Sequence, residues 1–239
     1  LPEDTDEFRV AGALAGSPIN IVKAKTVDLM VPAEAEIVIE GYISTEFLEP
    51  EAPFGESHGH VNLQEYNAFM DVTCITRKKD AILTSIISQV TPSESSVIKR
   101  VAYEPMFTEH LRDHLGIKGV IKVSMHEPLT NIRKLIIVIC ERGMPSTEIW
   151  RALYGAASLH RAAGKYVIAV NDDIDPDNAD AVFWAMAYRA NPALDVEILK
   201  HRDSGHGPRS DRAGGEDASV LFDATLKEDF PPISLPKKE

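Results

Sequence analysis

The sequence is poor in cysteine and contains no long apolar run. Its two cysteines, Cys74 and Cys140, lie inside apolar alternating segments of a 239-residue chain. This placement is typical of reduced thiols that pack in a core and does not fit a disulfide framework. No apolar run approaches the roughly 18 residues of a membrane span, and no signal peptide is recognisable. We therefore expect a cytoplasmic protein without a membrane partner.

Positive charge is also scarce. The 25 Lys and Arg residues are outnumbered by 37 Asp and Glu residues, which gives a net charge of -12. Because nucleic acids and anionic membranes are bound by clustered Lys and Arg, this balance argues against both as partners. The sequence also lacks a P-loop, a dinucleotide-binding glycine fingerprint and a Ser-His-Asp signature. Those enzyme classes are therefore disfavoured.

The first third of the chain is rich in Val, Ile, Thr and Phe and predicts antiparallel strands at 19–24, 36–44, 66–77 and 81–88. The polar Lys78-Lys79-Asp80 is expected to form a hairpin turn between the last two strands. Thr91-Pro92-Ser93-Glu94 then predicts the start of a helix, with a cap residue, a proline at the first helical position and a glutamate at the third. The chain is long enough for one large core or two smaller ones.

The remainder alternates strands with helices. We expect helices at 145–161 and 175–190, and strands at 119–125, 134–140, 166–170 and 196–199. Since this order builds a sheet covered by helices, a second, α/β domain is expected at 93–239 after a first domain at 1–92. Residues 203–217 are predicted to form an exposed or gating loop. The proline-rich tail from Phe230 to Glu239 is expected to be extended.

Two glutamates carry the most specific local signal. They flank the segment Glu51-Ala52-Pro53-Phe54-Gly55-Glu56, in which a Pro-Gly turn would fix the separation of the acids. Two carboxylates in one enclosed site do not both ionise easily, so one keeps its proton near neutral pH and can act as a general acid. Glu56 is the better candidate, because it follows the expected turn and precedes His58 and His60. The alternative of two solvated loop residues stays open on spacing alone.

Three glycine-flanked histidines and the acidic run from Asn171 to Asp175 are only weak indications of a binding site. His58-Gly59-His60 would point both rings to one side of an extended strand, but four metal ligands are not assembled locally. His206, also flanked by glycines, is either a substrate contact or an exposed side chain. The run from Asn171 to Asp175 lacks the spacing of a calcium loop. A strand-end turn followed by a helix cap explains it better.

Several longer stretches resemble the UbiD family of reversible (de)carboxylases. They are the segment Val31-Pro32-Ala33-Glu34-Ala35-Glu36-Ile37-Val38-Ile39-Glu40-Gly41, the acidic motif with His58-Gly59, and the stretches 7–14, 22–29, 165–175, 182–189 and 222–225. These landmarks keep their order over nearly the whole chain. The resemblance implies a mixed α+β and α/β fold. Residues 1–92 would form part of a split β-barrel FMN-binding domain that carries the acidic motif, and residues 93–239 an α/β domain of the oligomerisation type.

The resemblance also implies chemistry. The family decarboxylates aromatic and α,β-unsaturated carboxylic acids with prenylated FMN, which is held beside a divalent metal, usually manganese, and potassium. Glu56 matches the proton donor, and Glu51 the other acid of a Glu-Arg-Glu network. Glu7 matches the carboxylate that binds the metal at the cofactor phosphate, and Lys165 a lysine that reaches this phosphate. The cofactor would carry the bond cleavage, while Glu56 delivers the proton that replaces CO2, or acts as base in carboxylation.

Some features depart from the family pattern. Ala52 stands where the family usually has glycine, and His60 and Asn62 stand where aromatic residues are common, which favours a polar, hydroxylated aromatic acid as substrate. The chain opens at Leu1 without an initiator methionine, and family members are longer. The part before Leu1 would supply the other metal ligands, much of the cofactor pocket and the network arginine. We therefore expect a homo-oligomer, or another chain that supplies this part.

The sequence is compatible with three functions. The leading one is a UbiD-type enzyme that acts on a small aromatic or enoic acid and CO2. The second is a non-catalytic UbiD-like subunit or oligomerisation domain of a multi-subunit carboxylase. A metal hydrolase that uses Glu51, Glu56 and the two neighbouring histidines is the weakest, because its ligand set is incomplete.

Overall fold

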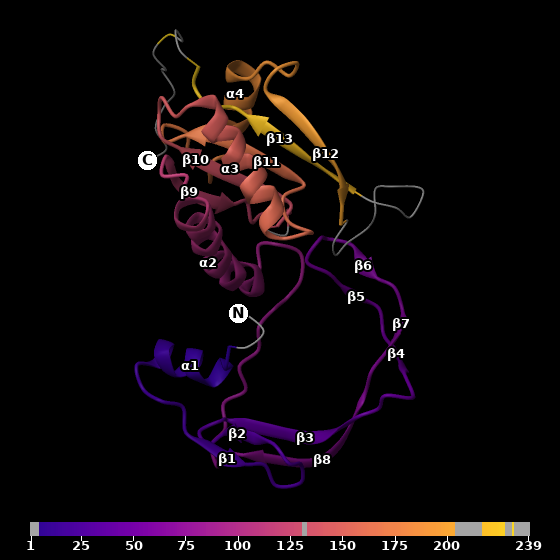
Figure 1. Cartoon of the computed structure of the whole chain (residues 1–239). Coiled ribbons are helices and arrows are strands. Elements are labelled where there is room, and N and C mark those ends of the chain that lie inside the picture. The colour runs from indigo at the N-terminus through magenta and orange to yellow at the C-terminus, as the bar shows by residue number, and fades with distance from the viewer. Residues whose placement is uncertain (1–4, 131–132, 204–216, 228–230, 232–239) are drawn as a thin grey trace. The chain divides into compact units, whose positions relative to one another are not determined.

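The computed structural model describes residues 5–130, 133–203, 217–227 and 231. The chain divides into two compact units (Figure 1). The first comprises residues 1–54 and 63–85, and the second comprises residues 55–62 and 86–239. No helix within the described residues is both long and apolar enough to cross a membrane.

The first unit consists of one helix and short antiparallel strand pairs. Its elements are α1 (Glu7–Ala15), β1 (Ile21–Lys23), β2 (Met30–Pro32), β3 (Ile37–Ile43), β4 (Glu49–Glu51), β7 (Glu65–Asn67) and β8 (Met70–Arg77). β1 pairs with β2, β3 with β8 and β4 with β7, all antiparallel as expected. Each pair is a separate two-stranded sheet, and residues 5–85 contain no closed barrel.

Two close contacts involve β3, one with β8 and one with the β1–β2 hairpin. At a register shift between Glu40 and Gly41, β3 approaches β8 so closely that a Cβ on Gly41 would overlap the Asp71 carbonyl oxygen. The Glu40 carboxylate is buried and accepts hydrogen bonds from the amides of Lys25, at 2.9 Å, and Thr26, at 2.6 Å. The Lys25 amide, followed by that of Thr26, outweighs burial and lowers the pKa of Glu40. Glu40 therefore ties the β1–β2 hairpin to β3.

Residues 81–88 do not form the expected strand, and Lys78-Lys79-Asp80 is not a hairpin turn. The chain is instead fastened to Glu36, whose carboxylate accepts hydrogen bonds from Lys78 Nζ at 2.7 Å and from the Ile82 amide at 3.1 Å. From Ile82 to Val90 the apolar side chains are exposed. Strand propensity without a partner strand did not produce a strand here.

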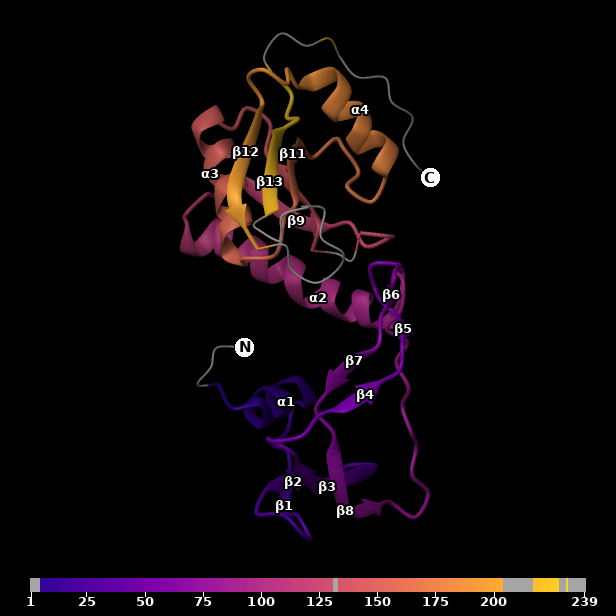
Figure 2. The same ribbon diagram turned by 90° about the vertical axis from the view of Figure 1, so that its right-hand side faces the viewer.

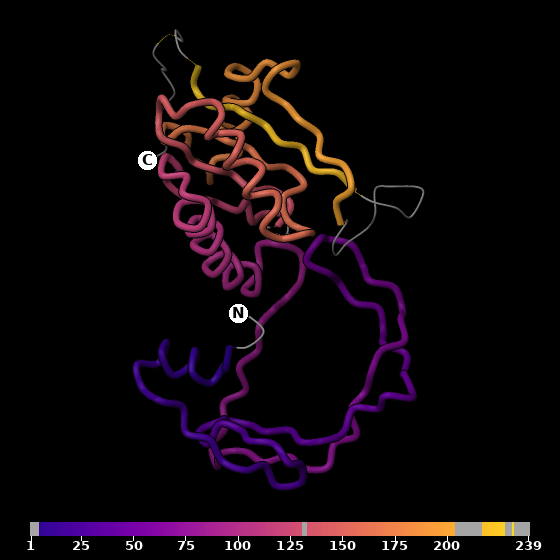
Figure 3. Tube along the Cα trace, in the orientation of Figure 1, coloured from indigo at the N-terminus to yellow at the C-terminus, as the bar shows by residue number. Residues whose placement is uncertain are grey.

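The second unit is an α/β layer structure. Its elements are β5 (Phe54–Gly55, which begins at the last residue of the first unit), β6 (Val61–Asn62), α2 (Glu94–Glu109), the π-helical turn η1 (His110–His114), β9 (Val120–Met125), β10 (Leu135–Cys140), α3 (Ser146–Leu159), β11 (Tyr166–Asn171), α4 (Ala179–Arg189), β12 (Val196–Arg202) and β13 (Asp217–Asp223). β5 and β6 form a hairpin whose path is clear in the chain trace (Figure 3).

The main sheet has the order β12-β13-β11-β10-β9. β11 runs parallel to both β10 and β13, while the edge strands β9 and β12 are antiparallel to their neighbours. The sequence predicted that residues 196–199 form the last strand of the sheet, and this prediction is wrong. β12 continues to Arg202, and β13 follows it in the chain but inserts between β12 and β11 in the sheet.

Helices cover both faces of this sheet, with α3 and α4 on opposite sides (Figure 2). On one face α2, η1 and α3 bury a core that includes Phe107, Leu111 and Leu153 against Val123, Val138 and Cys140. On the other face α4 packs Val182 and Ala185 against Ile137, Ile168 and Val170. Both cysteines are free thiols, as predicted, but only Cys140 packs in a core, whereas Cys74 is half-buried. Burial, followed by the charge of Asp223, raises the pKa of Cys140 to about 12.

Two helices begin later than the sequence predicted, which placed the first turn of one at Pro92 and the start of the other at residue 175. Ser93, not Thr91, caps α2: the Ser93 hydroxyl accepts from the Ser96 amide, and the Ser96 hydroxyl accepts from the Ser93 amide, so Pro92 precedes the helix instead of beginning it. α4 begins at Ala179 because the Asn178 side chain caps it.

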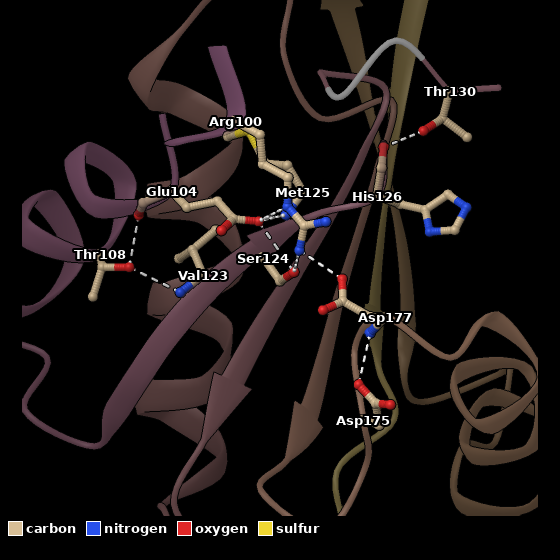
Figure 4. Close-up of polar contacts among 10 residues, drawn as sticks. All are labelled: Arg100, Glu104, Thr108, Val123, Ser124, Met125, His126, Thr130, Asp175 and Asp177. Carbon is tan, nitrogen blue, oxygen red and sulfur yellow. Dashed lines mark hydrogen bonds and ion pairs between the residues drawn. The ribbon is translucent and has the colours of Figure 1, made fainter. Parts of the chain in front are cut away.

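Arg100 of α2 ties three elements of the second unit together (Figure 4). Its guanidinium contacts Glu104 at 2.7 Å and Asp177, in the loop before α4, at 2.6 Å. It also donates to the Ser124 hydroxyl of β9 at 3.2 Å. The Glu104 carboxylate in turn accepts the Met125 amide at 2.8 Å. This network fixes α2 and the approach to α4 on the sheet.

Candidate active site

Glu56 stands at the start of a tight turn between β5 and β6. The Glu56 amide donates to the His60 carbonyl and the Gly59 amide donates to the Glu56 carbonyl, both at 3.0 Å. Gly59 has a φ of 85°, which glycine adopts without strain. Glu56 and His58 are half-buried, and the His58 and His60 rings lie 5.5 Å apart between centroids. A backbone turn therefore sets the position of Glu56.

The turn lies after Glu56 and not between the two acids, which corrects the sequence prediction. Ala52 and Pro53 join β4 to β5, and Gly55 lies within β5 and is absent from the glycines with positive φ. Proline biases the residue before it toward extended backbone, so Pro53 extends this segment. Glu51 pairs with Glu65 in the β4–β7 ladder and accepts a hydrogen bond from the Asn67 side chain at 2.6 Å. It belongs to the first unit, and Glu56 belongs to the second.

Glu7 occupies the first turn of α1, where its carboxylate is exposed and favoured by the helix dipole. Asp6 caps this helix by accepting the Phe8 amide at 2.9 Å. Within the described part of the chain, no group of three or more His, Cys, Asp and Glu side chains could hold a metal ion. The described residues alone therefore do not fit a complete divalent-metal site.

Lys165 lies immediately before β11 and forms an ion pair with Asp217 at the start of β13. Its Nζ atom is 2.9 Å and 3.2 Å from the two carboxylate oxygens of Asp217. Burial alone would raise the pKa of Asp217, but hydrogen bonds from Lys165 and the Ala218 amide, with the charges of Lys165 and Lys134, lower it. The ion pair holds the lysine at the end of the sheet.

Lys134 is a second cation at the same end, which the sequence reading missed. β10 and β11 are parallel with Leu135 opposite Tyr166, and the Tyr166 amide donates to the Lys134 carbonyl at 2.9 Å. Lys134 and Lys165 therefore directly precede adjacent strands. Two neighbouring cations suit an anionic group such as a cofactor phosphate. The sequence does show a lysine directly before each of these apolar strands. Only the register of β10 with β11 shows that the two lysines are neighbours.

The acidic run from Asn171 to Asp175 has a structural role, whereas the other predicted loop and tail residues lie largely outside the described part of the chain. The Asn171 side chain donates to the carbonyls of Cys140 and Glu141, at 3.3 Å and 3.2 Å. Asp173 pairs with Arg189, so the 171–175 run is a strand-end turn and not a calcium loop. His206 and most of the predicted 203–217 loop lie outside the described residues, as does the tail apart from residue 231.

Comparison with known proteins identifies the family. Residues 1–90 match the UbiD domain, described as the 3-octaprenyl-4-hydroxybenzoate carboxy-lyase Rift-related domain, and residues 96–224 match UbiD_C, the C-terminal domain of the same carboxy-lyase. The chain therefore belongs to the UbiD family, as its sequence motifs predicted.

Solved structures agree with this assignment. The UbiD-class enzyme HmfF from Pelotomaculum thermopropionicum in complex with FMN is 28% identical, with a TM-score of 0.82 over 97% of this chain and 52% of its own. An evolved dimeric form of HmfF in complex with prFMN is 27% identical, with a TM-score of 0.79 over 99% and 50%. The apo 3,4-dihydroxybenzoic acid decarboxylase (AroY) of Klebsiella pneumoniae, at 22% identity and a TM-score of 0.79 over 98% and 51%, shares the fold. The chain spans about half the length of these proteins.

Proposed function

We propose that this chain belongs to a reversible decarboxylase of an aromatic or α,β-unsaturated carboxylic acid, a carboxy-lyase that uses prenylated FMN. The observation that carries the proposal is its match to the UbiD domains over residues 1–90 and 96–224. A relative bound to prFMN, similar over 99% of this chain, supports the choice of cofactor.

In this proposal Glu56 is the proton donor. Bound prenylated FMN would supply the electron sink for cleavage of the bond to CO2. The protonated Glu56 carboxyl delivers its proton to the carbon that has lost CO2, and in the reverse direction the carboxylate accepts that proton. The hydrogen bond from the Glu56 amide to the His60 carbonyl fixes the backbone from which this side chain projects.

The other site residues have binding roles. Lys165, positioned by Asp217, would contact the cofactor phosphate, with Lys134 beside it. Glu51 would adjust the charge of Glu56, and Glu7 would supply one ligand to a divalent metal such as Mn2+, with K+ nearby. We further propose that residues 1–92 form part of a split β-barrel and that residues 93–239 mediate oligomerisation. A cytoplasmic location remains a prediction.

The test uses the protein encoded by the complete reading frame, matured with prenylated FMN and assayed for CO2 release from a panel of aromatic and enoic acids. Glu56→Gln should lower turnover by roughly a hundredfold or more and leave the flavin absorbance unchanged. Glu46→Gln, which alters an exposed loop carboxylate, serves as the control. Normal turnover by the Glu56 variant would refute its role as proton donor.

A non-catalytic UbiD-like subunit is the second candidate, because the described residues lack a complete metal site. The same preparation separates the two functions. A colourless, metal-free protein that forms a defined oligomer would favour the subunit, whereas flavin absorbance with CO2 release would exclude it.

A further inference from the structure

Two histidines lie side by side in the π-helical turn that follows α2. His110 and His114 are the first and last residues of η1. The centres of their rings are 5.9 Å apart, and the ring planes are 76° from parallel. Two histidines four residues apart on one helix face are the arrangement that binds Zn2+ in helical metal sites. Neither residue has a role in the proposed function.

The two rings are close enough to bind one ion together. Imidazole nitrogens lie about 2.0–2.1 Å from a bound Zn2+, so two nitrogens on the same ion are at most about 4.2 Å apart. The nitrogens lie on the ring edges, and His114 is exposed. Rotation of its side chain can therefore turn a nitrogen toward an ion that His110 also binds.

The backbone of the turn is held from several sides. Leu111, which lies between the histidines, is fully buried in the core, and its carbonyl accepts the Ile117 amide at 2.9 Å. The Leu115 amide donates to the His110 carbonyl at 2.9 Å, over the five-residue separation of a π turn. The Leu115 carbonyl in turn accepts from Arg151 of α3 at 2.9 Å. Ligands on a fixed backbone lose less entropy when they bind an ion.

The charged side chains between the two histidines already have partners. Arg112 donates to the Ile121 carbonyl of β9 at 3.4 Å, and Asp113 pairs with Lys118 at 3.2 Å. In the part of the chain that the structure describes, no hydrogen bond or ion pair engages either imidazole of the turn. Binding of an ion would therefore break no existing bond of these rings.

The surroundings also favour the form of histidine that binds metals. His110 is half-buried, and burial, followed by the charge of His114, lowers the pKa of His110. Metal ions bind neutral imidazole. Among the described residues no third His, Cys, Asp or Glu joins the pair, so water would fill the remaining positions of the ion.

We propose that His110 and His114 together bind one divalent transition-metal ion such as Zn2+. Imidazole suits Zn2+, Cu2+ and Ni2+, whereas Mg2+ and Ca2+ prefer oxygen ligands. The ion joins the two ends of η1 and thereby stabilises the turn between α2 and β9. Binding at this turn requires neither the flavin nor turnover.

The test is calorimetric titration of the full chain with ZnCl2 at neutral pH, after a chelator has removed any bound metal. His110→Ala and His114→Ala should each raise the Kd of the tightest site roughly tenfold or more, because even a residue that only orients a metal ligand contributes 10–100-fold. Zn2+ should also raise the urea midpoint of the unaltered chain, but not that of the variant with both substitutions.

Two further variants separate metal binding from a general effect of substitution. His114→Cys places another zinc ligand at the same position and should bind Zn2+ much more tightly than His114→Ala. His201→Asn removes an exposed histidine of β12 at a φ of 64°, which asparagine tolerates, and should bind like the unaltered chain. Circular dichroism checks that every variant is folded.

His58 and His60, whose rings lie 5.5 Å apart, are the competing histidine pair. The inference is wrong if the tightest Zn2+ site survives in both the His110→Ala and His114→Ala variants, or if His60→Ala removes it instead. An equal loss in His201→Asn would also overturn it. None of these measurements uses CO2 release, so their outcome is independent of whether the proposed function holds.

Discussion

Replacing Asp173 should destabilise the second unit far more than replacing its neighbour Asp172. Arg189 of α4 is 1% exposed and bonds the Asp173 carboxylate at 2.6 Å and 3.1 Å. Its guanidinium also lies 5.3 Å from the centre of the Trp184 ring. Asp173→Asn removes the counter-charge and leaves the guanidinium buried. Breaking a buried pair in this way costs about 3–5 kcal/mol.

Asp172→Asn is the matched control. Asp172 pairs with Arg142 at 3.4 Å, but both side chains are more than half exposed. Exposed pairs contribute about 0–1 kcal/mol. The two substitutions are chemically identical and adjacent in sequence, and both carboxylates contact Arg142, that of Asp173 at 3.3 Å. The difference between them therefore reports the buried pair of Asp173 with Arg189.

The assay is urea unfolding of the full chain, followed by circular dichroism and tryptophan fluorescence at several pH values. Burial alone would raise the pKa of Asp173, but the hydrogen bond and charge of Arg189, with the charge of Arg142, lower it. The stabilisation is therefore complete well above the unfolded value of about 3.9 and is lost as the pH falls through the lowered pKa. The deficit of Asp173→Asn should be full at pH 7 and shrink toward pH 2. A cost at pH 7 equal to that of Asp172→Asn would refute this reasoning.

Three further predictions concern packing and caps. Ser93→Ala should cost about 1 kcal/mol in the same unfolding assay, because it removes the N-cap of α2; an unchanged midpoint would contradict this. Gly41→Ala should destabilise the first unit by about 1–3 kcal/mol through overlap with the Asp71 carbonyl, seen as faster hydrogen exchange in β3 and β8, and unchanged exchange would count against it. Iodoacetamide should modify half-buried Cys74 in the native chain and spare Cys140 until urea unfolds it, and equal labelling rates would show that Cys140 is accessible.

The α/β half of the fold could be predicted because its signals are local. The apolar runs at 134–140 and 166–170 correspond to the buried strands β10 and β11. β13 could not be assigned in the same way, because its place between β12 and β11 depends on pairing with residues distant in sequence. In the first unit, residues 81–88 have strand propensity but no partner strand.

In the candidate site, too, the residues in a contiguous motif could be predicted, and those brought together by strand pairing could not. Glu56 was identified from a contiguous motif, although the turn that positions it lies after it and not before it. Lys134 and Asp217 are far from Lys165 in sequence and become its neighbours only through the registers of β10 with β11 and of β11 with β13. A sequence without its strand pairing does not contain that information.

The assignment of residues 55–62 to the second unit has a consequence for engineering. The chain enters this unit for one short hairpin, returns to the first unit at Leu63 and enters the second again at Ile86. A chimaera joined at a single point near residue 92 would take the Glu56 hairpin from one parent and its structural unit from the other. An exchange that takes the hairpin and the rest of the second unit from the same parent needs three crossover points, at both ends of the hairpin and near residue 86.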